Sequence, residues 1–324
     1  MKKIYCFSLI AMLAVFNLMA DELVSVPVAT LTHDGVATQF YGATALKDAH
    51  AAAVSGDVIT LNSGTFNACN ITKGITLRGA CMGTTTEMSQ AGMKRTLIRG
   101  NFNIKVPQTD TQTLNIEDCN LYSIVCVDSV PQISFTRVTN RYYYTSLTGY
   151  AVTTTHMLVR PGVGKFEAIQ CSFYNIVTVA LSSNSNITNT STTFLFSNSA
   201  ISFYNSLLPA HVTMDHCVTG EWDSPDNNIV YDGVFSNCIF TYYYSSYPSL
   251  SQLPMGCTAR NCVAVNPNAF TLCSSQNCKS NVSLSTLYNT SITSNAYGCY
   301  TEYLRDEAAA TYLGTDGTQV GIYG

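Results

Sequence analysis

The 324-residue chain has few charged side chains, since Lys, Arg, Asp and Glu together make up 11% of it. No basic residue occurs between Lys165 and Arg260, and the formal net charge is −4 at pH 7. After residues 1–20, 14 Lys and Arg stand against 20 Asp and Glu, and a net negative chain is unsuited to binding rows of phosphates. We therefore expect neither nucleic acid nor an anionic membrane as a partner.

Long apolar runs are also scarce. One run follows Lys2 and Lys3 and ends at Leu18-Met19-Ala20, which is typical of a signal peptide over residues 1–20. No later run reaches the roughly 18 apolar residues of a membrane-spanning helix. The sequence predicts an exported protein of the periplasm, cell surface or extracellular space, with one domain over 21–324.

Amphipathic helix spacing is nearly absent, and a short strand-like motif recurs instead. Alternating apolar residues lead to a polar pair and then a small residue. The copies are 114–119, 133–138, 166–171, 194–199, 212–217, 234–238 and 258–262. A unit of about 20 residues that repeats along a chain indicates stacked turns, each burying its apolar face against its neighbours. The sequence predicts an all-β, single-stranded parallel β-helix, a solenoid.

The predicted stacking places the last residue of each motif on one inward ladder. Its members are Cys119, Val138, Cys171, Ser199, Cys217, Cys238 and Cys262. A second register aligns 74–79 with 95–100, which puts Arg78 beside Arg99. The alanine-rich segment 43–54 favours a short N-terminal helix that caps the open end.

The chain has 13 cysteines, of which 12 follow the signal peptide. Those on the predicted ladder read as small, buried, free thiols. The alternatives are disulfides among Cys257, Cys262, Cys273 and Cys278, which cluster in the sequence, or a zinc site there. The segments Cys257-x4-Cys262 and Cys273-x4-Cys278 contain no histidine, which argues against a zinc site.

Segments 56–66 and 71–80, Gly56-Asp57-Val58-Ile59-Thr60-Leu61 onward and Ile71-Thr72-Lys73-Gly74 onward, resemble the first coils of the pectin-lyase-like right-handed β-helix superfamily. With 31–35 and the alanine-rich segment, the chain resembles exported β-helix proteins of gut anaerobes that have no assigned function. The resemblance implies a right-handed parallel β-helix, and we expect a monomer. It implies little about activity, because one fold hosts many functions.

Catalytic motifs of this superfamily are mostly missing. The Asn-Thr-Asp, Asp-Asp, Gly-His-Gly and Arg-x-Lys sequences of the polygalacturonase-like hydrolases do not occur. Segment 212–217 is similar to the Ile-Asp-His strand of pectate lyases, so Asp215, His216 and Asp232 are the catalytic candidates. A calcium site would use Asp215, Glu221, Asp223 and Asp226. The alternative is that these residues occupy polar turn positions and a solvated loop.

Two tyrosine runs and the single tryptophan are the candidates for ligand binding. They are Tyr142, Tyr143, Tyr144, Tyr242, Tyr243, Tyr244 and Trp222. Tyrosine offers a sugar ring an apolar face and a hydrogen-bonding tip, although ordinary packing explains such residues equally well.

The sequence thus predicts a non-catalytic exported β-helix that binds glycan or another macromolecule. The alternative is a divergent polysaccharide lyase or glycoside hydrolase that acts on acidic polysaccharide. We expect no cofactor, with calcium as the one ion to consider.

Overall fold

The computed structural model describes residues 26–81, 95–122, 124–140, 157–173, 176–178, 189–203, 208–220, 222, 229–241, 252–288 and 304–321. The predicted signal peptide and both tyrosine runs lie outside these residues. Strands dominate the described part, and their pairing is parallel except for the first strand, which pairs antiparallel with both the second and the third. The predicted all-β class is confirmed to this extent.

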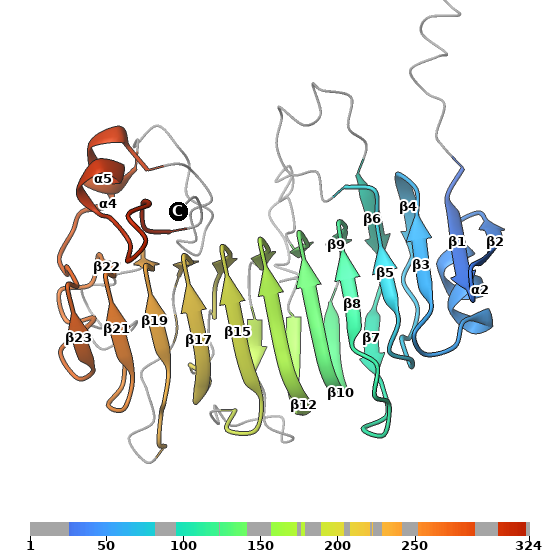
Figure 1. Ribbon diagram of the computed structural model, residues 1–324, viewed down its shortest axis with the longest axis horizontal. Coiled ribbons are helices and arrows are strands. Elements are labelled where there is room, and N and C mark those ends of the chain that lie inside the picture. The colour runs from blue at the N-terminus through green and yellow to red at the C-terminus, as the bar shows by residue number, and fades with distance from the viewer. Residues whose placement is uncertain are drawn as a thin grey trace, which may run out of the picture.

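The described strands form two sheets, and the larger has 14 strands. It contains β1 (Val28–His33), β2 (Val36–Tyr41), β3 (Val58–Leu61), β5 (Thr76–Arg78), β7 (Phe102–Lys105), β8 (Leu114–Glu117), β10 (Val125–Thr136), β12 (Met157–Ile169), β14 (Ile176–Thr178), β15 (Thr193–Ser197), β17 (His211–Asp215), β19 (Val234–Ser236), β21 (Thr258–Arg260) and β23 (Ser274–Gln276). Figure 1 shows these strands side by side along the longest axis of the molecule. We call this the long sheet.

The second sheet has nine short strands. It contains β4 (Gly64–Asn67), β6 (Thr96–Arg99), β9 (Asn120–Tyr122), β11 (Thr139–Asn140), β13 (Ser172–Phe173), β16 (Ala200–Ile201), β18 (Val218–Thr219), β20 (Ile239–Phe240) and β22 (Val263–Ala264). From β8 onward most strands of the long sheet lead directly into one of these short strands. Each strand then pairs in parallel with its equivalent in the next repeat.

The core lies between the sheets and is rich in phenylalanine. Alternate residues of each long-sheet strand point inward, as the apolar periodicity predicts. Phe135 and Phe166 on neighbouring strands have ring centroids 5.3 Å apart, and Phe166 lies 5.5 Å from Phe194. Contacts of this kind repeat along the stack, so each repeat buries its rings against the next.

The predicted inward ladder is confirmed and gains one member, Cys278. We call it the inner ladder: Cys119, Val138, Cys171, Ser199, Cys217, Cys238, Cys262 and Cys278. The backbone hydrogen bonds Ile239 N to Cys217 O and Val263 N to Cys238 O show the stacking. Its polar members also donate to the carbonyl two residues back, as Ser199 Oγ does to Ser197 O at 2.7 Å.

The residue before each inner-ladder position turns the chain from the long sheet into the second sheet. All eight such residues have a left-handed backbone, with φ between 47° and 57°. We call them the turn ladder: Asp118, Arg137, Gln170, Asn198, His216, Asn237, Asn261 and Asn277. The recurring polar residue of the motif is therefore the point at which the chain changes sheet.

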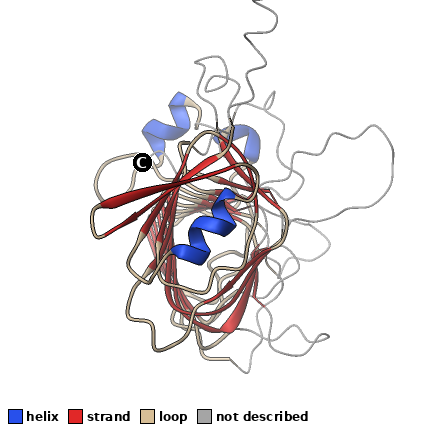
Figure 2. Ribbon diagram, turned by 90° about the vertical axis from the view of Figure 1, so that its right-hand side faces the viewer, coloured by secondary structure: helices blue, strands red, loops and turns tan. Residues whose placement is uncertain are grey.

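The predicted capping helix is confirmed as α2 (Ala45–Ala52). Figure 2 shows it lying across the end of the strands. Ala45, Leu46 and Ala49 are fully buried on the inner side. Lys73 Nζ contacts the carbonyls of His50, Ala51 and Ala53 at 2.9, 3.3 and 2.5 Å, and so satisfies acceptors that a helix end leaves free.

The predicted register of 74–79 on 95–100 is wrong. Strand β5 belongs to the long sheet and β6 to the second sheet, so Arg78 does not lie beside Arg99. Arg78 is opposite Glu117, with its Nε 2.7 Å from Oε2. The two segments resemble each other because strands of both sheets carry the same apolar alternation.

The C-terminal part covers the outside of the second sheet. Helices α4 (Leu284–Leu287) and α5 (Asp306–Thr311) lie at the end opposite α2 (Figure 1). They help to bury the outward-facing Val218, Ile239 and Val263 together with Val320. In the described residues no helix has both the length and the apolar character to cross a membrane.

Candidate functional site

Asp215 and His216, two of the catalytic candidates, lie where β17 turns into β18. Asp215 ends the strand and His216 follows on the turn ladder with φ 49°. Neighbouring repeats have Asn198 and Asn237 at the equivalent position. Asparagine adopts this left-handed backbone more easily than most residues. The histidine costs free energy at this turn, which contacts of its side chain can offset.

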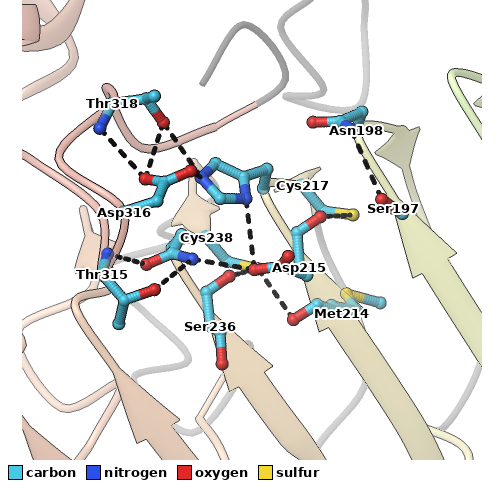
Figure 3. A network of polar contacts seen from close by, with 12 residues as sticks. Ser197, Asn198, Met214, Asp215, Cys217, Ser236, Cys238, Thr315, Asp316 and Thr318 are labelled. Carbon is cyan, nitrogen blue, oxygen red and sulfur yellow. Dashed lines mark hydrogen bonds and ion pairs between the residues drawn. The ribbon is translucent and has the colours of Figure 1, made fainter.

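Figure 3 shows the polar network around this histidine. Its Nδ1 lies 3.2 Å from Asp215 Oδ1, and its Nε2 lies 3.5 Å from Asp316 Oδ2. Thr318 Oγ1 is 3.3 Å from the same Nε2. The imidazole, only 9% exposed, therefore sits between two half-exposed carboxylates.

Asn237, one turn further along, ties the same network to the C-terminal segment. Its Nδ2 donates to Asp215 Oδ1 at 2.8 Å, and its Oδ1 accepts from Thr315 N at 2.9 Å. Its backbone carbonyl accepts from Gly321 N at 2.8 Å. We call residues 315–321 the C-terminal clasp, because their contacts with His216 and Asn237 fasten them to two successive turns.

Asp316 is the charged member of the clasp. The hydrogen bonds donated by Thr318, first from its backbone N at 3.0 Å and then from its hydroxyl at 2.8 Å, lower the pKa of Asp316. His216 lowers this pKa further. Asp316 is therefore a hydrogen-bond acceptor that faces the imidazole, rather than a proton donor.

Asp232, the third catalytic candidate, lies elsewhere. Its Oδ1 contacts His211 Nδ1 at 3.0 Å, while His211 Nε2 contacts Thr190 O at 3.1 Å. His211 begins β17 and Asp215 ends it, so their Cα atoms are roughly 13 Å apart at about 3.3 Å per residue, and Asp232 lies at the His211 end. The structure does not bring the three catalytic candidates into one site.

The calcium candidates are only partly covered by the structure. Asp215 is described and its Oδ1 already accepts from Asn237, whereas Glu221, Asp223 and Asp226 lie outside the described residues. Among the residues that are described, no group of three or more His, Cys, Asp or Glu side chains is arranged to hold a metal ion.

Trp222 belongs to the core, not to a surface. It is 0% exposed, packs edge-on against Phe240 with centroids 5.6 Å apart, and donates from Nε1 to Gln252 O at 3.4 Å. A fully buried ring cannot stack on a sugar, which corrects the ligand-binding role expected for it. The tyrosine candidates, 142–144 and 242–244, lie outside the described residues.

The outward side of the long sheet forms a polar surface that the sequence analysis did not single out. We call it the outer face. Parallel pairing places Thr193 beside His211, and Thr213 beside Val234 and then Thr258. Neighbouring strands lie about 4.8 Å apart, so these side chains form regular columns. The signal was present in the sequence, since polar residues alternate with the inward apolar ones.

Comparisons of the chain with protein-family models, with curated proteins and with solved structures gave no match. The geometry is therefore the basis for a functional conclusion. It consists of a fastened Asp215–His216 pair at the clasp and an extended polar face along the long sheet.

Proposed function

We propose that this protein is an exported right-handed parallel β-helix that binds an extended glycan on its outer face without cleaving it. Support for the fold comes from the regular alternation between two parallel sheets and from the helix over one end. Support for export comes from the N-terminal sequence described above.

The outer face is the observation that carries the binding role. Thr193 and Thr213 are exposed and Thr258 is partly exposed. Each hydroxyl can donate a hydrogen bond to a ligand and accept one from it. The columns continue over many strands, so an extended polymer can contact several repeats at once. Each contact is weak, but the affinity rises when one polymer makes many of them along a repeating surface.

Binding without cleavage fits the placement of the acidic groups. Hydrolysis of a glycosidic bond needs two carboxyl groups within about 5 to 9.5 Å on either side of the bond. Asp215 and Asp232 are at opposite ends of β17, and both ring nitrogens of His216 face clasp or turn groups. A divergent lyase or hydrolase built on Asp215 and His216 is the alternative, and it is favoured by two carboxylates flanking one imidazole.

The test measures retention and product formation together. The protein without residues 1–20 would be run in native gels containing plant or host polysaccharides, with and without calcium, and incubated with the same polymers. We expect retention by at least one polymer and no new reducing ends or unsaturated uronate. Product that disappears in Asp215→Ala would overturn the proposal in favour of the enzyme.

A matched pair of triple variants locates the surface. Thr193→Ala, Thr213→Ala and Thr258→Ala together should abolish retention. The control replaces three exposed threonines away from the outer face, Thr38, Thr65 and Thr72, and should bind normally. Retention that survives the first triple variant but is lost on changing Tyr143 and Tyr243 would move the site to the tyrosine runs.

A further inference from the structure

Four cysteines bracket the last two strands of the long sheet. Cys257 precedes β21 and Cys262 follows its turn, while Cys273 and Cys278 hold the same places around β23. Thr258 is paired with Ser274, so the preceding residues Cys257 and Cys273 are opposite each other. Hydrogen bonds from Ser274 N to Cys257 O at 3.1 Å and from Lys279 N to Cys262 O at 2.8 Å fix both alignments.

The spacing of the two pairs suits a covalent bridge. Neighbouring parallel strands lie about 4.8 Å apart, and disulfides join Cα atoms separated by about 4.4 to 6.8 Å. The Cys262 thiol interacts electrostatically with the thiols of both Cys278 and Cys238, and of these two partners Cys278 is the partly exposed one. All four are free thiols in this structure.

Each pair combines one buried and one accessible thiol. Cys257 and Cys262 are 1% and 0% exposed, whereas Cys273 and Cys278 are partly exposed. Strand β23 ends the sheet, and all three of its residues are exposed. The accessible thiols thus lie on the strand with the least support, where an edge frays most easily.

We propose that this chain forms two disulfides on oxidation, Cys257–Cys273 and Cys262–Cys278, which attach β23 to the strand before it. The inference goes beyond glycan binding and does not depend on it. It also chooses one pairing among the three that four cysteines allow.

The reaction is a thiol–disulfide exchange with an oxidised dithiol or with oxidised glutathione. Cys278 is the first to react because an external oxidant can reach it, whereas Cys262 is buried; its interaction with Cys262 raises the pKa of the Cys278 thiol, so accessibility and not thiolate fraction selects it. Once deprotonated, Cys278 attacks one sulfur of the oxidant and expels the other as a thiolate. Cys262 then attacks Cys278 in the mixed disulfide and releases the second thiol of the oxidant. Two protein thiols become one disulfide, the oxidant's disulfide becomes two thiols, and the protons of the protein thiols pass to them.

Cys273 and Cys257 react in the same order. Burial raises the pKa of the Cys273 thiol to about 11 and that of Cys257 to about 12, so the more accessible member is also the readier thiolate. The inner-ladder thiols Cys217 and Cys238 are 0% exposed, which keeps an external oxidant away from them.

Peptide mapping shows which cysteines are bridged and which stay free. The folded chain would be treated with oxidised glutathione, unfolded in N-ethylmaleimide, and digested with trypsin and chymotrypsin. Trypsin cleaves after Arg260 and Lys279, so peptide 261–279 contains Cys262, Cys273 and Cys278. We expect the peptides that contain Cys257 and Cys262 each to be linked to the fragment that contains Cys273 and Cys278, and Cys217 and Cys238 to be alkylated. Neither protease cleaves between Cys273 and Cys278, so the single variants below assign the partner of each.

Two single variants keep the assignment falsifiable. Cys273→Ser should leave Cys257 alkylated and keep the other bridge, and Cys278→Ser should do the reverse. Oxidation should raise the midpoint of thermal unfolding of the unmodified chain by several degrees. It should not raise the midpoint of the variant that carries both Cys273→Ser and Cys278→Ser. A Cys238–Cys262 bridge, or four alkylated thiols after oxidation, would overturn the proposal.

Discussion

Single residues of the turn ladder decide how well each repeat can change sheet. Four of its eight members are asparagine, whose short polar side chain tolerates the left-handed backbone. Gln170 and Arg137 have longer side chains with the same φ, 54° and 52°. Such residues cost free energy that the surrounding strand pairing must offset.

Replacing Gln170 should therefore stabilise the protein. Gln170→Asn and Gln170→Gly should each raise the free energy of unfolding, by up to about 1 kcal/mol, because the left-handed turn is easier for both. The measurement is the urea midpoint of the folded chain. Asn261→Gln is the matched reverse change and should lower the midpoint, so an unchanged midpoint in both variants would contradict this view.

Ser199 tests the polar role of the inner ladder. Its hydroxyl donates to Ser197 O and accepts from Cys171 N at 3.0 Å. Ser199→Ala should cost about 1 to 3 kcal/mol in unfolding free energy, because buried backbone groups lose their partner. Ser199→Cys, which copies the neighbouring repeats, should cost clearly less in the same urea titration. Equal losses would mean that only side-chain volume matters.

At the scale of elements, α2 depends on groups that burial keeps uncharged or paired. His50 is buried on the helix and its Nε2 accepts from Thr72 N at 3.2 Å, which requires a ring that is unprotonated there. Desolvation, followed by the charge of Lys73, lowers the pKa of His50 to about 4. Protonation thus competes directly with docking of the cap.

The cap should consequently weaken in mild acid. The unfolded chain takes up a proton at His50 near pH 6.5, whereas the folded chain does so near pH 4, so stability falls as the pH drops between these values. His50→Gln keeps an acceptor for Thr72 without titrating. Urea midpoints measured from pH 7 to pH 4 should therefore fall less steeply in His50→Gln than in the unmodified chain, and parallel slopes would refute the assignment.

Elements differed in how well the sequence predicted them. The alanine-rich cap and the inner ladder were predictable because helix propensity and apolar alternation are local signals. The hairpin β1–β2 was missed, although Asp34-Gly35, both with positive φ, is a strong hairpin turn. Strands β5 and β6 were wrongly assigned to one sheet, because strands of both sheets carry the same alternation of apolar and polar residues.

At the scale of the whole molecule, the C-terminal clasp closes a small second core. Val320 packs with Val218, Ile239 and Val263, which face outward from the second sheet. These three residues would form an apolar stripe without that cover. The bonds from the clasp to His216 and Asn237 hold this cover at its edge.

Truncating Val320 tests this arrangement. Val320→Ala should lower the free energy of unfolding by about 2 kcal/mol, since it removes two buried methyl groups and leaves a cavity. Hydrogen exchange should rise in β18, β20 and β22 before it rises elsewhere. Val234→Ala, a change at a 41% exposed position, is the control and should alter neither quantity.

The candidate site was predictable only in part. Asp215 and His216 were identified because segment 212–217 is similar to a catalytic strand of known lyases. Their partner Asp316 could not be, since a contact between residues about 100 positions apart leaves no local signal. Asp232 was grouped with them by closeness in sequence, yet it precedes β19 and lies beside His211, the first residue of β17, whereas Asp215 is the last.

The clasp also implies an order of assembly. Neighbouring repeats join residues some 20 positions apart, whereas Thr315 meets Asn237 across 78 positions and Thr318 meets His216 across 102. Bringing distant segments together costs more chain entropy, and such contacts generally slow folding. During synthesis these repeats are available first, and the segment that covers their outward-facing apolar residues leaves the ribosome after them. Until then Val218, Ile239 and Val263 face water on an otherwise finished stack, which makes this the interval of greatest aggregation risk.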